Sequence, residues 1–118
     1  MEDLKLHIAH VGINSADEAE ALAAAKLLEA IFGFDYKVGN SSIFSANKRI
    51  EIMKTPFRGA KGHLAVGTAD IDEAVAYLRR KGIAFAEETA VVKEGKLIAI
   101  YLQQEIAGFA VHLVQAAG

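Results

Sequence analysis

Two stretches of the sequence decide the fold: HVGINSADEA at residues 10–19 and HLAVGTADIDEA at residues 63–74. Each opens on a histidine, continues through a short apolar run and ends in an acidic segment typical of a helix start. The second stretch carries two additional residues near its acidic end. Their similarity indicates an internal repeat, so the two halves of the chain should fold alike.

The first half of the chain reads as a strand, a helix and three further strands. Apolar residues predict a strand over residues 4–13, and Ser15 with Glu18 forms a capping box for a helix that ends at Gly33. Further strands are predicted over residues 36–38, 42–45 and 49–54. One apolar face of the helix should lie on the sheet, and it consists of Ala21, Ala24, Ala25, Leu28, Ile31 and Phe32.

The second half repeats this order. A strand is predicted over residues 63–68, and Asp70 with Glu73 caps a helix that stops at Gly82. Three strands should follow, over residues 83–92, 97–102 and 109–114. We therefore expect a single domain over residues 1–118, with one module at about residues 4–55 and a second at about residues 61–115.

The composition suits a packed protein with one hydrophobic core. Of 118 residues, 53% are hydrophobic and 24% are charged, and the formal net charge is -2. The basic residues are scattered, which argues against a nucleic-acid partner. No segment resembles a signal peptide or approaches the roughly 20 apolar residues of a membrane span, so we expect a cytoplasmic protein without a membrane partner. Because cysteine is absent, the strong metal ligands available are histidine and carboxylate side chains.

The repeat also predicts which way the histidines point. Successive residues of a strand face opposite sides of a sheet, and the apolar residues 64 and 66 should face the second helix, so His63 faces away from it. By equivalence, His10 faces away from the first helix. The first strand alone would leave this open, because Leu6 and Ile8 share the alternation of His10.

A second pair of equivalent positions lies in the last strand of each half. RIEIMK at residues 49–54 matches AVHLVQ at residues 110–115, which pairs Glu51 with His112. Alternation turns their apolar neighbours toward the helices and turns Glu51 and His112 toward the opposite face.

Four polar residues are thus expected on one face of the sheet: His10, Glu51, His63 and His112. A lone histidine in a strand is usually a packed or surface residue, but three histidines and a carboxylate at equivalent positions favour a metal site. Such ligands suit Zn, Ni, Fe, Co or Mn, and the residue types leave the choice open. His7 is expected on the helix side of its strand, as a structural or exposed residue.

The order of these segments resembles the vicinal-oxygen-chelate superfamily of glyoxalases, bleomycin-resistance proteins and dioxygenases, over residues 4–115. The matching segments are HVGI at 10–13, GHLAV at 62–66, DIDEA at 70–74 and GFAVHLV at 108–114. The resemblance implies an α+β fold in which two βαβββ modules form a cupped eight-stranded mixed sheet, with the helices on the outer face. It also implies a metal in the cup, held from the first and fourth strands of each module.

The resemblance has one departure and one closer match. Glyoxalase I enzymes generally carry, at the place of His112, a glutamate that leaves the metal to shuttle a proton, so His112 argues against glyoxalase I activity itself. GNSSIF at residues 39–44 and YLQQEIAGF at residues 101–109 resemble the small domains of this superfamily that occur beside or fused to ketohydroxyglutarate and ketodeoxyphosphogluconate aldolases.

The expected function is a metal-dependent, glyoxalase-like lyase or isomerase acting on a small α-hydroxy or α-keto metabolite, through chelation and enolate stabilisation. Glu51 is the candidate base, with His112 as the alternative, and Tyr101 is a candidate substrate-binding residue because alternation places it on the cup side. A non-catalytic small-ligand binder and an accessory domain of an aldolase stay open. A homodimer is expected, because families with this module often build the cup across a dimer.

Overall fold

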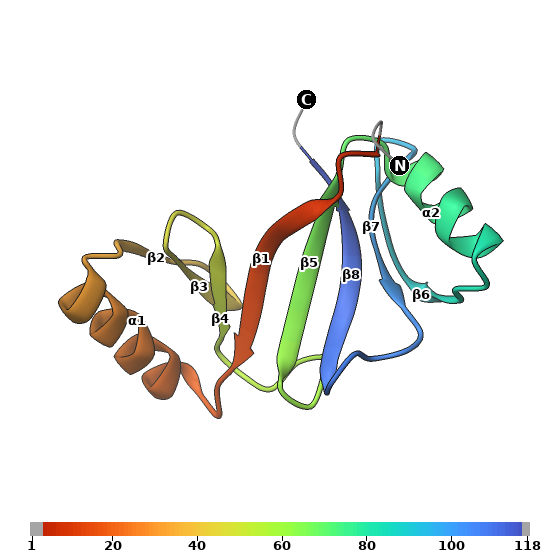
Figure 1. Cartoon of the computed structure of the whole chain (residues 1–118). Helices are drawn as coiled ribbons and strands as arrows, with labels where there is room; N and C mark the ends of the chain where they lie inside the picture. Colours follow the sequence, from red (N-terminus) through yellow and green to blue (C-terminus); the bar gives the residue numbers. More distant parts are fainter. Residues whose placement is uncertain (1–3, 117–118) are drawn as a thin grey trace.

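The computed structural model describes residues 4–116 as one eight-stranded sheet with two helices (Figure 1). Within this range neither helix is long and apolar enough to cross a membrane. The chain runs through one strand, one helix and three strands, and then repeats that order. The elements are β1 (His7–Asn14), α1 (Glu18–Phe32), β2 (Tyr36–Val38), β3 (Ser42–Ser45), β4 (Ile50–Met53), β5 (Gly62–Thr68), α2 (Ile71–Arg80), β6 (Phe85–Lys93), β7 (Lys96–Leu102) and β8 (Phe109–Gln115).

The strand order of the sheet is β2-β3-β4-β1-β5-β8-β7-β6. Each half of the chain therefore contributes four adjacent strands, and β1 pairs antiparallel with β5 where the halves meet. The pairs β1–β4 and β5–β8 are parallel, and the outer pairs are antiparallel. The prediction of an α+β fold with a mixed eight-stranded sheet is confirmed.

Both helices cover the same face of the sheet. Val11 of β1 is level with Ile50, which packs under α1, and with Leu64, which alternates with Val66 under α2. Level residues of paired strands share a face, so the two small cores lie on one side. The buried core residues under α1 are Ala21, Ala25, Ile43 and Ile52, and those under α2 are Leu4, Ile71, Ala74, Val75, Phe85, Ile100 and Leu113.

One helix cap follows the prediction and the other does not. Asp70 Oδ1 accepts the N–H of Glu73 at 3.2 Å, as predicted for α2. The cap of α1 is Asp17, which accepts the N–H of Glu20 at 2.8 Å, and the prediction of Ser15 was wrong. Pairing of β1 with β4 continues to Asn14, so the chain is still extended where Ser15 would have to start the helix.

The predicted apolar face of α1 is also wrong at its C-terminal end. Ile31 and Phe32 are 60% and 62% exposed. A helix of 15 residues is about 22 Å long, whereas a four-residue strand such as β3 covers about 13 Å. The last turn of α1 therefore extends beyond the strands that the helix covers.

A bulge in β1 reverses the alternation near its start. Ile8 is level with Val66, but His10 is level with the next residue of β5, Ala65, so Ala9 is an extra residue. Ile8 therefore lies on the helix side and His10 on the opposite side, which corrects the expectation that they share a face. His7, level with Gly67, lies on the side of His10 and not on the helix side as predicted. We call the face opposite the helices, which carries His10 and His63, the helix-free face.

Candidate metal centre

The four predicted ligands come from the four central strands of the sheet, in the order β4, β1, β5, β8. Their positions form two neighbouring rows across the helix-free face. One row holds Glu51 and His63 with Gly12 between them, and the other holds His10 and His112 with Ala65 between them. The small residues in the middle of each row leave room for the imidazole rings.

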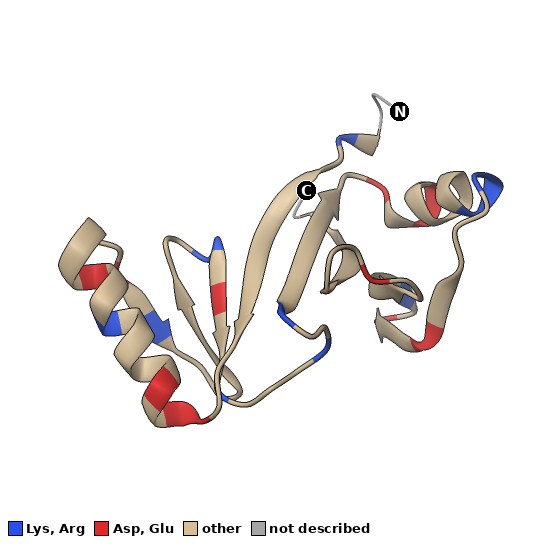
Figure 2. Cartoon of the chain, turned by 60° about the horizontal axis from the view of Figure 1, so that its bottom comes forward, with Lys and Arg blue, Asp and Glu red and all other residues tan. Residues whose placement is uncertain are grey.

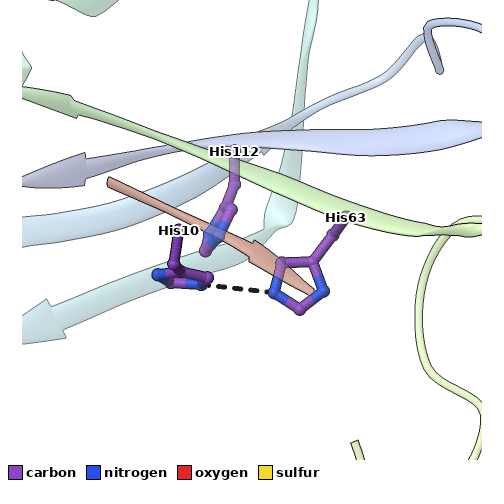
Figure 3. Close-up of side chains that lie close together, drawn as sticks. All are labelled: His10, His63 and His112. Atoms are coloured by element: carbon purple, nitrogen blue, oxygen red, sulfur yellow. Dashed lines mark hydrogen bonds between the residues drawn. The ribbon is translucent and has the colours of Figure 1, made fainter. Parts of the chain in front are cut away.

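The three histidine rings point toward one another (Figure 3). One ligand atom from each of His10, His63 and His112 lies within 4.8 Å of the other two. Nε2 of His10 is 3.3 Å from Nε2 of His63. Oε1 of Glu51 is 3.1 Å from Nε2 of His63 and 3.4 Å from Nε2 of His10. The strand alternation inferred from the repeat thus brings the predicted residues together.

These spacings fit a bound metal ion. Ligand atoms at about 2.0–2.1 Å from a divalent metal ion lie about 2.9 Å from one another when they are adjacent in an octahedral site, which leaves positions open for a substrate, and about 3.3–3.4 Å in a tetrahedral one. The buried Nε2 of His112 has no hydrogen-bond partner among the described residues, which is costly for a polar atom unless it has another ligand. The donor set and its unpaired nitrogen therefore suit a divalent cation.

Gly12 makes the position of His63 possible. The ring of His63, which is 1% exposed, lies directly over Gly12, and a Cβ atom there would overlap three of its ring atoms. Sequence reasoning missed this role, although Gly12 stands two residues after His10 and shares its expected face. The glycine is needed for space and not for backbone conformation, because it is not among the positive-φ residues.

Ser42 is a further residue that sequence reasoning missed. Its hydroxyl donates to Oε2 of Glu51 at 2.7 Å, while Oε1 faces the two histidines. Burial alone would raise the pKa of Glu51, but hydrogen bonds from His10, His63 and Ser42 outweigh it and hold that pKa well below its ordinary value. Glu51 is therefore an anion at neutral pH. The alternation of side chains along the predicted strand at residues 42–45 was the sequence pattern that could have indicated the face on which Ser42 lies.

Tyr101 lies beside the histidines, as its alternation predicted. It is level with His112, and the two rings stack with centroids 4.4 Å apart and an interplanar angle of 9°. Burial, with the nearby charge of Glu51, raises the pKa of Tyr101 to about 12, so its hydroxyl is neutral. Burial also lowers the pKa of His112 to about 4, helped by His63 and His10, so its imidazole is neutral at pH 7.

The depressed pKa of His112 predicts how stability changes with pH. Between its ordinary pKa of 6.5 and the folded value of about 4, the unfolded chain binds more protons than the folded chain. The free energy of unfolding of the metal-free protein should therefore fall as the pH is lowered through this window. Urea unfolding in EDTA at about pH 7 and about pH 5 measures the change. In His112→Gln the difference should shrink, and an undiminished difference would contradict the assignment.

His7 stays apart from the candidate metal centre although it lies on the same face. Its Nδ1 is 2.8 Å from the carbonyl oxygen of Lys5, its ring is exposed, and it is not part of the histidine group.

Charged residues of both signs are interspersed along the chain, and no basic stripe follows the sheet (Figure 2).

Comparisons with known proteins agree on the fold. No protein-family model matches the chain, and no curated protein matches its sequence. A selenomethionine crystal structure of methylmalonyl-CoA epimerase is 20% identical, with full coverage of both chains and a TM-score of 0.73. A variant of the Streptomyces coelicolor epimerase in complex with 2-nitronate-propionyl-CoA is 20% identical, with a TM-score of 0.63 over 94% of this chain and 97% of that one.

The epimerase from Mycobacterium tuberculosis is also 20% identical, with a TM-score of 0.63 over 94% of this chain and 88% of that chain. At these identities the likeness concerns the fold. The repeated strand–helix–three-strand order, the single mixed sheet and these neighbours together identify the chain as having the vicinal-oxygen-chelate fold.

Proposed function

We propose that His10, Glu51, His63 and His112 bind one divalent metal ion. The observation that carries this proposal is the convergence of three donor atoms, from His10, His63 and Glu51, at 3.1–3.4 Å from one another. His112 adds a neutral, buried imidazole whose Nε2 has no hydrogen-bond partner within residues 4–116. Three imidazoles and one carboxylate suit Zn, Ni, Fe, Co or Mn.

We further propose a metal-dependent isomerase or lyase that acts on a small α-hydroxy or α-keto metabolite. A bound divalent metal would chelate two adjacent oxygens of the substrate and stabilise an enolate as a Lewis acid. Among the solved structures that resemble this chain are methylmalonyl-CoA epimerases, five of which are named as complexes with CoA compounds. That support concerns the kind of reaction and leaves the substrate of this chain open.

Proton transfer in such a reaction requires a base next to the chelated carbon. Glu51 is our first candidate, because it is anionic and Ser42 orients its second oxygen. His112 is the alternative, because its imidazole is neutral at pH 7. Tyr101 stacks on His112 and would form the wall against which the substrate lies.

Metal analysis of the protein purified without a histidine tag tests the proposed metal centre. Protein produced under metal-replete conditions should carry up to one equivalent of a first-row divalent metal. If it carries none, and if added cobalt or zinc changes neither its visible spectrum nor its thermal unfolding, the proposed centre does not exist.

A non-catalytic ligand binder is the second candidate, and one cavity favours it. A cavity of about 640 Å³ lies at the end of the first module, and its lining includes the aromatic side chains of Phe34, Tyr36 and Phe44. Phe44 also contacts the metal centre, with its ring centroid 6.3 Å from that of His10. A binder of this kind would hold its ligand equally well after removal of the metal, whereas the proposed enzyme would not.

We also propose that the chain forms a homodimer. Ile8 and Ile13 are 58% and 42% exposed on the helix side of β1, between the areas that the two helices cover. Leu27 and Ile31 add exposed apolar surface on α1. Exposed apolar surface of this kind is typical of a contact with another protein, and a second copy is the occupant that we propose.

A further inference from the structure

The connection between β4 and β5 lies against the metal centre. This segment, residues 54–61, leads from the strand of Glu51 to the strand of His63 (Figure 1). The ring of Phe57 lies with its centroid 6.1 Å from that of His63 and 6.4 Å from that of Tyr101. The middle of the connection therefore borders the space in which a metal-bound ligand would lie.

Asn14, the last residue of β1, holds this part of the connection in place. Its side-chain oxygen accepts the N–H of Phe57 at 3.1 Å. Its amide nitrogen donates to the carbonyl oxygen of Gly59 at 3.0 Å and to that of Phe57 at 3.4 Å. The backbone on both sides of Arg58 is thus fixed by a single side chain from the central strand.

Arg58 is placed over the aromatic wall of the centre. Its Cζ lies 5.1 Å from the centroid of the Tyr101 ring, which in turn stacks on His112. Among residues 4–116, the ion pairs that form involve other cations, such as Lys54 with Glu18 and Arg79 with Glu87. Arg58 thus has no carboxylate partner within this range, and its five donors remain available.

An unpaired guanidinium beside a metal centre is suited to bind an anion. The guanidinium group is planar and always charged, and its fork of N–H groups matches the two oxygens of a carboxylate. Glu51 already accepts hydrogen bonds from Ser42 and faces two histidines, so it does not use Arg58. An anion bound by Arg58 would therefore come from a ligand.

We propose that Arg58 binds an oxyanionic group, carboxylate or phosphate, on the same small molecule whose adjacent oxygens the metal centre chelates. This inference rests on the proposed function, and it narrows the substrate class to acids with a second anionic group. Asn14 acts as a positioning residue for Arg58, and the guanidinium lies over the face of the Tyr101 ring.

The test compares two ligands of equal length on cobalt-loaded protein, followed by visible absorption. Succinic monohydroxamic acid carries a chelating hydroxamate and a distant carboxylate, whereas butyrohydroxamic acid carries the hydroxamate and an apolar tail. The wild type should bind the first at least about tenfold more tightly, as expected for a charge-assisted hydrogen bond. Phosphonoacetohydroxamic acid shows whether a phosphate-like group is accepted in its place.

Three variants give the matched comparison. Arg58→Gln should lose the preference for the carboxylated ligand while binding butyrohydroxamic acid as the wild type does. Lys61→Gln removes a positive charge from the same connection and should keep the preference. Arg58→Lys should retain part of it, because the charge remains and the fork is lost.

The outcomes separate the two levels of the proposal. If cobalt or butyrohydroxamic acid does not bind, the proposed metal function fails. If both ligands bind the wild type equally, or if Arg58→Gln keeps the preference, Arg58 has no such role although the metal centre stands. An equal loss in Lys61→Gln would also overturn the proposal, because general attraction by positive charge would then explain the preference.

Discussion

Gly12→Ala is expected to abolish high-affinity metal binding without removing any ligand. The added methyl group would overlap the ring of His63, which is buried. The ring must leave the point where its Nε2 meets Glu51 and His10, so metal affinity should fall by about 100-fold or more. Overpacking of this kind also costs about 1–3 kcal/mol of stability.

Gly67→Ala is the matched control for this variant. Gly67 also lies across the β1–β5 pair from a histidine, and a Cβ atom there would meet the ring of His7. Because His7 is exposed, its ring can turn into solvent. Isothermal titration with zinc should therefore show affinity close to that of the wild type for Gly67→Ala. Similar losses in both variants would mean that the strand pair, and not the His63 ring, is sensitive to added volume.

Removal of one candidate ligand imidazole is also expected to have a large effect on metal binding. His10→Ala and His63→Ala each leave fewer donor atoms at the point of convergence, so both should be purified without stoichiometric metal. His7→Ala should retain the metal content of the wild type, because its ring lies outside the group. Elemental analysis of the three variants and the wild type measures this directly.

His63→Ala could lose metal simply because a buried side chain is gone, so thermal unfolding is needed beside it. A ligand that binds only the folded state raises the melting temperature. Zinc should raise that of the wild type and of His7→Ala, and should leave that of His10→Ala unchanged. The His10 side chain is 18% exposed and that of His63 is 2% exposed, so truncation of His10 removes less buried packing than truncation of His63. A full zinc response in His10→Ala would exclude His10 as a ligand.

Most of what could be predicted about the candidate site came from the internal repeat in the sequence. Because His63 lies in a regular strand, the apolar residues that alternate with it placed it correctly, and equivalence then placed His10. Direct reading of β1 would have failed, because the bulge at Ala9 puts Ile8 and His10 on opposite faces. Local alternation cannot reveal a bulge, whereas a second copy of the motif can compensate for it.

Other features depend on contacts that the sequence does not display. The cap of α1 shifted to Asp17 because β1 stays paired up to Asn14, which is a property of the neighbouring strand. The need for glycine at position 12 arises from a ring on a strand 51 positions later in the chain. Arg58 acquires its position from hydrogen bonds made by Asn14. The sequence showed it only as one of three basic residues around the connection, with Lys54 and Lys61, that could attract an anionic substrate, and scattered surface charges need no such role.

The antiparallel meeting of β1 and β5 has a mechanical consequence. It is the place where the two halves of the sheet join, and the candidate ligands lie on both sides of it: His10 and Glu51 on one half, His63 and His112 on the other. An ion bound by all four would cross-link the two halves of the sheet. Loss of the ion would weaken the contact between the halves before it affected the structure of either half. A substrate bound to the same ion would be held by residues of both halves.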